Sequence, residues 1–172
     1  MIDVFTGGKF ITVEEAWPEG SNFNVSTYTN VVPQFLTLPS RKSDQTTTLI
    51  LVTSSPKNRE ARFQIRNTWA EANITKKYNI EVNFVLGVDK EEKYDVSDEI
   101  EVFSDILIVN VKDSYMNLTL KSVFILKYLS DINGLSKKLK TVMKTDDDCY
   151  VNIQALAHLI KNNSIGKSFL GK

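Results

Sequence analysis

The chain lacks several residue types on which whole classes of protein depend. Its 172 residues include one cysteine, Cys149, and one histidine, His158. These counts exclude an intrachain disulfide, a thiolate metal cluster and a histidine-rich zinc site. His158 is also the one histidine available to a Ser-His-Asp or Cys-His catalytic site. We expect Cys149 to point into the core as a small hydrophobe and His158 to pack within an apolar helix.

Long apolar runs and an excess of one charge are also absent. The longest apolar run is four residues, as at Leu49–Val52, whereas a membrane-spanning helix needs about 20 and a signal-peptide core about seven. Lys plus Arg and Asp plus Glu each number 21, so the formal net charge is zero. Such a chain has no global field for nucleic acid or an anionic membrane, and an anion site has to be local. Neither the P-loop nor the G-x-G-x-x-G motif occurs, which disfavours both of those nucleotide chemistries.

The pattern of the sequence changes near residue 45. Residues 1–45 hold three of the four prolines and no sustained apolar period, which predicts a stem-like N-terminal segment that can include short strands. The rest alternates: strands are predicted over 46–53, 80–87, 106–109 and 139–145, and helices over 59–69, 91–103, 118–132 and from Ile153, behind Asn152 as N-cap. This alternation predicts an α/β fold with a mostly parallel sheet, helices on both faces and a ligand site at the carboxyl ends of the strands.

Three adjacent carboxylates, Asp146, Asp147 and Asp148, follow the last predicted strand. They repel one another, so a fold that gathers them gains from a cation. In an extended segment Asp146 and Asp148 point to one side and Asp147 elsewhere, and two hard oxygen ligands suit Mg²⁺ or Mn²⁺. An acidic turn that caps the next helix is the alternative, and the position at a strand end favours the metal.

Three arginines share one face of the first predicted helix. Arg59, Arg62 and Arg66 are spaced i, i+3, i+7, shortly after the first strand. Guanidinium groups there suit a phosphate or a buried carboxylate. On the arginines alone, however, a solvated face paired with Glu60 and Glu71 is the favoured interpretation.

Four N-x-[ST] sequons, at Asn24, Asn73, Asn117 and Asn162, are candidate glycosylation sites. They favour a secretory route only weakly. Asn117 is also a candidate helix N-cap, which would make it a poor acceptor.

Five motifs occur in a fixed order between residues 47 and 172. They are Arg62-x-x-Ile65-Arg66-x-Thr68-Trp69, Phe84-Val85-Leu86-Gly87, Glu101-x-x-x-Asp105-Ile106, Asp113-Ser114-Tyr115-x-Asn117-Leu118-Thr119-Leu120-Lys121 and Lys144-Thr145-Asp146-Asp147-Asp148-x-Tyr150-Val151-Asn152. This set resembles the β-1,3-galactosyltransferase and β-1,3-N-acetylglucosaminyltransferase family, inverting enzymes of the Golgi lumen. Ala70 stands where the family usually has glycine, and Phe103-Ser104 where it has Tyr-Gly.

The resemblance implies a GT-A fold, in which a Rossmann-like nucleotide-sugar-binding half precedes an acceptor-binding half. Residues 46–172 would then be a partial galactosyltransferase domain, the donor-binding half. The implied reaction is Mn²⁺-dependent (or Mg²⁺-dependent) transfer of galactose or N-acetylglucosamine, from UDP-galactose or UDP-N-acetylglucosamine, to a hydroxyl of a glycan on a glycoprotein or glycolipid, with inversion. The general base is expected beyond residue 172. A type II anchor on the lumenal side of the Golgi membrane is expected in the full-length protein and absent from this chain, and no nucleic acid is expected as a partner.

The resemblance also assigns roles within the site. Asp148 would bind the metal directly, and Asp146 would face the ribose or a metal-bound water. The expected donor-binding residues are Arg62, Arg66, Asp113, Lys121, Asp146 and Asp147.

Two rival functions come from other classes. One is a catalytically silent module that binds a UDP-sugar or a partner, for which a dimer is left open. The other is a Mg²⁺-dependent phosphohydrolase, which the lack of a D-x-D-x-T nucleophile loop disfavours. A sheet edge exposed by truncation predicts marginal stability or oligomerisation in isolation.

Overall fold

The computed structural model describes residues 3–6, 9–12, 34–40, 43–88, 94–133 and 138–162. The chain divides into two compact units, residues 1–32 with 164–172 and residues 33–163. In the first unit, β1 (Asp3–Thr6) and β2 (Lys9–Thr12) form an antiparallel pair. The second unit carries the main sheet and every described site candidate.

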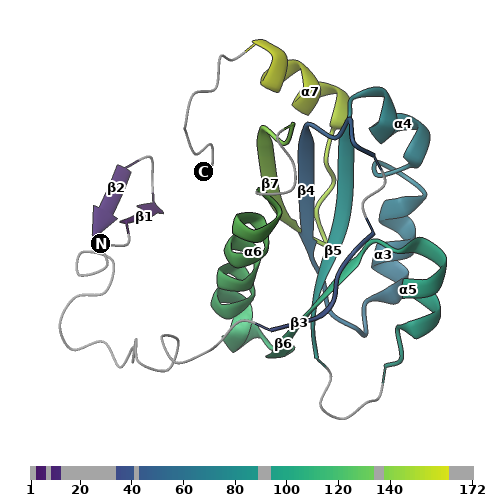
Figure 1. Ribbon diagram of the computed structural model, residues 1–172, viewed down its shortest axis with the longest axis vertical. Helices are drawn as coiled ribbons and strands as arrows, with labels where there is room; N and C mark the ends of the chain where they lie inside the picture. Colours follow the sequence, from purple (N-terminus) through teal and green to yellow (C-terminus); the bar gives the residue numbers. More distant parts are fainter. Residues whose placement is uncertain are drawn as a thin grey trace. The chain divides into compact units, whose positions relative to one another are not determined.

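The main sheet has five strands in the order β3-β6-β5-β4-β7 (Figure 1). They are β3 (Phe35–Thr37), β4 (Thr48–Thr53), β5 (Ile80–Val88), β6 (Ile106–Lys112) and β7 (Thr141–Asp146). The last four are mutually parallel, and only β3 runs antiparallel, against β6. The predicted mostly parallel α/β sheet is therefore confirmed. Because β3 belongs to this sheet, the compact unit begins within the segment expected to be stem-like.

Helices cover both faces of the sheet, as predicted. On one side lie α3 (Arg59–Arg66), α4 (Ala72–Lys77) and α5 (Ser97–Phe103), and on the other lies α6 (Leu118–Asn133), which follows the short 3₁₀ helix η1 (Tyr115–Asn117) (Figure 1). All six residues of β4 are buried, as expected of a strand covered on both faces. Ile50, Val52 and Phe84 pack with Ile65 and Trp69 in one core cluster.

The last helix, α7 (Ile153–Asn162), begins where the sequence predicts. The Asn152 Oδ1 accepts a hydrogen bond from the Ala155 amide at 2.9 Å, which confirms the N-cap. The expectations for two side chains in this region are wrong, because Cys149 and His158 are both exposed.

Other element boundaries differ from the predicted ones. The helix predicted over 59–69 ends at Arg66, and a separate short helix, α4, follows. The helix predicted over 91–103 begins only at Ser97, with residues 89–93 outside the described part. The strand predicted over 106–109 continues to Lys112, which carries its carboxyl end to the edge where the site lies.

Gly87 permits a close approach between β5 and β6. A Cβ at this position would lie 2.6 Å from the Val111 carbonyl oxygen and 3.0 Å from the Asp113 nitrogen. The pairing shifts register between Leu86 and Val88. Because Gly87 has no side chain, the Asp113 backbone can approach it, and the Gly87 amide donates to the Asp113 Oδ2 at 3.1 Å. This hydrogen bond helps to hold the Asp113 carboxylate in place.

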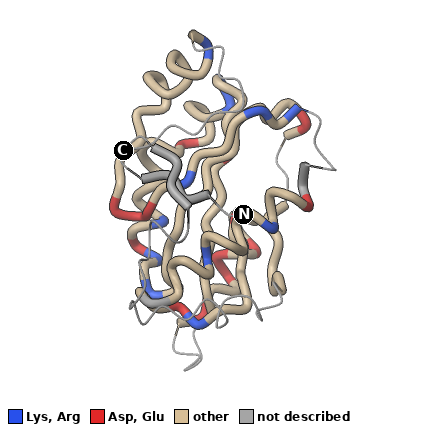
Figure 2. The backbone as a smooth tube through the Cα atoms, turned by 90° about the vertical axis from the view of Figure 1, so that its left-hand side faces the viewer, with Lys and Arg blue, Asp and Glu red and all other residues tan. Residues whose placement is uncertain are grey.

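Both signs of charge are interleaved along the described backbone, in keeping with the zero net charge (Figure 2). No helix in the described ranges is long and apolar enough to cross a membrane.

Candidate functional site

The carboxyl ends of four parallel strands meet at one edge of the sheet. The Ser54–Asn58 turn follows β4, Gly87 lies near the end of β5, Asp113 follows β6, and the acidic residues Asp146–Asp148 end β7. Gly87, Asp113 and the three aspartates belong to the motifs quoted above, whereas the Ser54–Asn58 turn does not. This edge is where parallel α/β sheets bind their ligands.

Ser54 joins these segments. Its amide donates to the Val85 carbonyl at 3.0 Å, and its hydroxyl donates to the Asp147 Oδ2 at 2.7 Å. The same hydroxyl oxygen accepts from Arg62 Nη1 at 3.1 Å, and the Ser54 carbonyl accepts from Lys121 Nζ at 2.8 Å. The residue is buried, so each of its polar groups is used within the protein.

The three aspartates that follow or end β7, Asp146, Asp147 and Asp148, form a turn that we call the acidic turn. They are not equivalent. Asp147 is half-buried, and its Oδ2 also accepts from Asn58 Nδ2 at 2.8 Å. Asp146 and Asp148 are both exposed, and among the described residues the Asp146 carboxylate has one long ion pair, at 3.6 Å, with Lys144. The middle residue thus differs from its neighbours in exposure and partners, in line with the alternation expected of an extended segment.

Arg62 is completely buried, and all five of its N–H groups have protein acceptors. Nε and Nη2 bind the two carboxylate oxygens of Glu99, each at 2.7 Å. The remaining donors reach the Ser54 hydroxyl and the carbonyls of Ser55 and Pro56. This bidentate pair locks the turn after β4 onto α5.

Arg66 is held by two carboxylates and two aromatic rings. It binds both oxygens of Asp105, at 2.9 and 2.8 Å, and its Nη1 binds Glu99 at 2.7 Å. Its guanidinium carbon lies 4.5 Å from the ring centroid of Phe84 and 4.1 Å from that of Phe103. The phenylalanine that departs from the family pattern therefore serves as one wall of a cation–π stack.

The charges of this cluster stabilise one another. Burial alone would raise the pKa of Glu99, but hydrogen bonds from Arg62 and Arg66 outweigh it and lower that pKa. Burial likewise opposes the charge of Arg66, and its bonds to Asp105 and Glu99 raise its pKa in spite of that. Of the alternatives for the arginine face, the structure shows buried carboxylates for Arg62 and Arg66 rather than pairing with Glu60 or Glu71. Arg59 is exposed and pairs with the exposed Asp98, so it alone is part of a solvated surface.

Lys121 and Asp113 form the corresponding pair on the opposite face of the sheet. Lys121 is 1% exposed, and its ammonium lies 2.7 Å from the Asp113 Oδ2, which also accepts from the Gly87 amide. The contact of Arg62, Arg66, Asp113 and Lys121 with a donor remains a prediction.

Sequence analysis missed three residues of this cluster, Ser54, Asn58 and Glu99. The third motif was read from Glu101, which is exposed, whereas Glu99 is buried and binds two arginines. The spacing of Glu99 to the half-buried Phe103, i to i+4, was the signal that would have placed Glu99 on the inward face of α5.

The metal site expected at Asp146 and Asp148 remains a prediction. In the described part of the chain, no three His, Cys, Asp or Glu side chains are grouped so that they could hold a metal ion by themselves. Asp146 and Asp148 offer two exposed carboxylates of the hard oxygen type that Mg²⁺ and Mn²⁺ prefer, with further positions left for phosphate oxygens and water.

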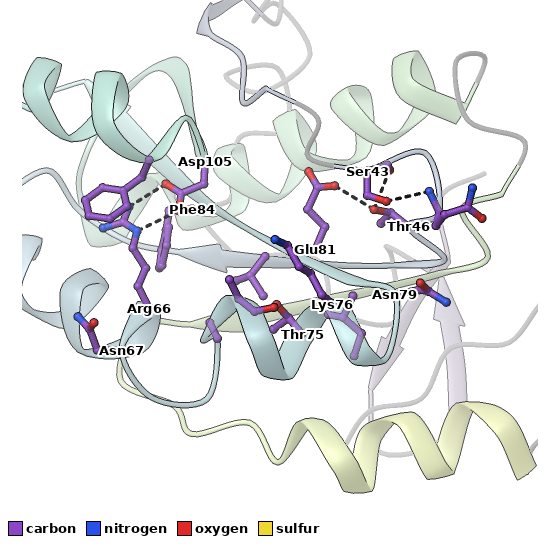
Figure 3. Close-up of a pocket in the computed structure, with 16 residues that line it drawn as sticks. Ser43, Thr46, Arg66, Asn67, Thr75, Lys76, Asn79, Glu81, Phe84 and Asp105 are labelled. Carbon is purple, nitrogen blue, oxygen red and sulfur yellow. Dashed lines mark hydrogen bonds and ion pairs between the residues drawn. The ribbon is translucent and has the colours of Figure 1, made fainter.

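In the described part of the chain, cavities adjoin the sheet at two different places. One, of about 470 Å³, lies beside the Ser54–Asn58 turn and is lined by Pro56, Gly87, Val88 and Tyr94, among others. The other, of about 480 Å³, lies at the amino end of β5, between the Arg66–Asp105 pair and the Thr46–Glu81 hydrogen bond (Figure 3). Only the first lies at the edge where the strands' carboxyl ends meet.

The sequons have different environments. Asn73 on α4 and Asn162 at the end of α7 are exposed. The Asn117 side chain donates to the Lys112 carbonyl at 2.9 Å and makes no capping bond of the predicted kind among the described contacts. Asn24 lies outside the described residues.

These observations define a Rossmann-like α/β domain with an acidic turn at the carboxyl edge of its parallel sheet. The family model described as galactosyltransferase matches residues 60–171, and the chain belongs to this family of glycosyltransferases. It is 35% identical over 112 residues to β-1,3-galactosyltransferase 1 of Mus musculus and of Homo sapiens, a match that covers 64% of this chain and 33% of each relative. To β-1,3-galactosyltransferase 5 of Mus musculus it is 35% identical over 126 residues, covering 72% of this chain and 40% of that protein. The chain thus spans about a third of the length of such relatives, and the resemblance that its motifs indicated is confirmed.

Proposed function

We propose that the chain forms the donor-binding half of a β-1,3-hexosyltransferase. It would bind UDP-galactose or UDP-N-acetylglucosamine with Mn²⁺ (or Mg²⁺), for inverting transfer to a glycan hydroxyl of a glycoprotein or glycolipid in the Golgi lumen. The observation that carries this proposal is the acidic turn: within the family-matched region, two exposed carboxylates stand at the carboxyl edge of a parallel sheet.

Asp148 and Asp146 are the residues that would hold the cation. A bound metal would supply neutralisation of the diphosphate as the sugar–phosphate bond breaks. The chain's own part is to present these two carboxylates at a fixed edge and to leave the metal's outer positions open to phosphate. An inverting displacement also needs a general base for the acceptor hydroxyl, and we assign none among the described residues.

The buried cations support this site from behind. Arg62 and Lys121 each bind Ser54, from α3 and α6 respectively. Because their ammonium and guanidinium groups are already paired within the protein, we propose that they hold the turn after β4 in place against the donor. Asp113 and Arg66 act indirectly: Asp113 binds Lys121, and Arg66 binds Glu99, which in turn holds Arg62.

Calorimetric titration of UDP into the purified chain, with and without Mn²⁺, tests the proposal. Binding is expected only with Mn²⁺ and is lost in Asp148→Ala. Asp131→Ala, which removes an exposed carboxylate paired with Lys127 on α6, is the matched control and keeps binding. Equal UDP binding by Asp148→Ala and the wild-type chain would contradict the assignment of the metal site.

Turnover is a separate measurement. Release of UDP from UDP-galactose in the presence of a glycan acceptor would show activity of these residues. Metal-dependent binding without release would identify a donor-binding module that is catalytically silent.

A further inference from the structure

We propose that Asp147 is a positioning residue that fixes the turn presenting Asp146 and Asp148. It does so by accepting hydrogen bonds from Ser54 and Asn58, and it does not contact the ligand. This inference rests on the proposed function, since it assigns the middle carboxylate of the same cation site.

The hydrogen bonds from Ser54 and Asn58 to Asp147, which we call the tether, join residues far apart in the sequence. The Asp147 Oδ2 accepts from Ser54 Oγ at 2.7 Å and from Asn58 Nδ2 at 2.8 Å, donors that lie 93 and 89 residues earlier in the chain. Hydrogen bonds to a carboxylate are about twice as strong as neutral ones. The Asp147 amide also donates to the Thr53 carbonyl at 3.1 Å. The acidic turn therefore cannot swing away from the end of β4 unless three hydrogen bonds break.

Ser54, one of the two donors to Asp147, is itself bound by two buried cationic side chains. The Ser54 hydroxyl is held by Arg62, which is fully buried and bound to both oxygens of Glu99 on α5. The Ser54 carbonyl is held by Lys121 from α6. A chain of buried contacts thus transmits the positions of α3, α5 and α6 to the acidic turn, as supporting residues do around preorganised metal ligands.

The exposure of the three carboxylates points the same way. Asp147 is half-buried with one oxygen saturated by two donors, whereas Asp146 and Asp148 are exposed. An Asp147 that acted as a metal ligand would have to bind through Oδ1 alone, or turn its carboxylate away from Ser54 and Asn58.

Asn58→Ala is the discriminating variant, because it removes one of the two side-chain hydrogen bonds to Asp147 and keeps all three carboxylates. We expect the affinity of the full chain for Mn²⁺, measured by electron paramagnetic resonance titration, to fall about tenfold, which corresponds to about 1.4 kcal/mol. Asn67→Ala is the matched control: it removes an exposed amide at the other end of α3, where Asn67 Nδ2 donates to the Phe63 carbonyl at 2.8 Å, and should leave affinity unchanged. Unchanged or tighter Mn²⁺ binding by Asn58→Ala would overturn the proposal, tighter binding being the result if a freed Asp147 joins the metal.

A double-mutant cycle tests whether Asn58 acts through Asp147. In an Asp147→Ala background, Asn58→Ala should change Mn²⁺ affinity by less than about twofold, because the contact that couples the two residues is already gone. Additive losses would show that Asn58 affects the metal by another route and would overturn the inference.

Hydrogen exchange gives a readout that needs no metal. In Asn58→Ala the amides of Asp147 and Cys149, which donate to Thr53 and Asp146, should exchange about tenfold faster, while the Phe124 amide within α6 keeps its rate. Unchanged exchange in the turn would overturn the tether. A wild-type chain that binds no Mn²⁺ would instead overturn the proposed function, and the exchange result would still decide the role of Asp147.

Discussion

Glu99→Gln is the substitution that most severely tests the buried ion-pair cluster. Glu99 is 1% exposed and binds Arg62 through both carboxylate oxygens and Arg66 through one. Glutamine keeps the shape of the side chain and one acceptor oxygen, but it removes the negative charge and replaces an acceptor with a donor that faces Arg62. Arg66 retains Asp105, so the uncompensated charge falls on Arg62.

The magnitude follows from the burial of Arg62. Removing one partner of a buried pair costs about 3–5 kcal/mol, because the other charge stays buried without compensation. We expect about 3 kcal/mol, the low end, because three further oxygens still accept from Arg62. For a chain of this size each kcal/mol corresponds to about 2–4 °C in the melting temperature, so a loss of roughly 6–12 °C is expected.

Urea and thermal unfolding monitored by circular dichroism would measure this loss. Glu101→Gln, on the same helix but exposed, is the matched control and should change stability by less than about 0.5 kcal/mol. A loss under about 1 kcal/mol in Glu99→Gln would refute the view that this carboxylate anchors the arginines.

Three further predictions concern stability. Gly87→Ala should cost about 1–3 kcal/mol in urea unfolding, because its Cβ would lie 2.6 Å from the Val111 carbonyl oxygen; no measurable cost would contradict that close contact. The pKa of Glu99 lies below its ordinary value of 4.5, so its contribution to stability is complete above pH 4.5 and is lost as pH falls through the lowered pKa. The urea midpoint of the wild-type chain should therefore fall more steeply between pH 6 and pH 3 than that of Glu99→Gln. Parallel curves for the two chains would contradict this. Asn152→Ala should cost about 1 kcal/mol, because the Ala155 amide loses its cap; an Asn152→Ser variant should recover most of that loss.

The parallel sheet was predictable from local pattern. Residues 49–52 and 106–109 consist only of leucine, isoleucine and valine, and such short apolar runs indicate buried strands. Alternation with helical segments then fixed the parallel topology, and the position of the acidic turn at a strand end followed. The short helix α4 was not predicted, because Thr75 is its one buried residue and its sequence therefore shows no apolar stripe.

The contacts of the site were less predictable, because they join residues far apart in sequence. The arginine face on α3 has the pattern of a solvated surface until Glu99 and Asp105, more than 30 residues later, are brought against it. The exposure of Cys149 has a similar origin. Its neighbours Val151 and Ile153 enter the core, and the chain turns at Asp147 and Asp148 in a way that no periodicity of the sequence indicates.

The most direct test of the donor-binding proposal is to locate the residues that UDP contacts. Amide chemical shifts of the labelled chain, recorded by nuclear magnetic resonance on titration with UDP and Mg²⁺, would locate the site residue by residue. We predict shifts in the Ser54–Asn58 turn, at Gly87 and from Asp146 to Tyr150. Shifts confined to the cavity at the amino end of β5, around Thr75 and Asn79, would contradict the assignment of the acidic turn as the donor site.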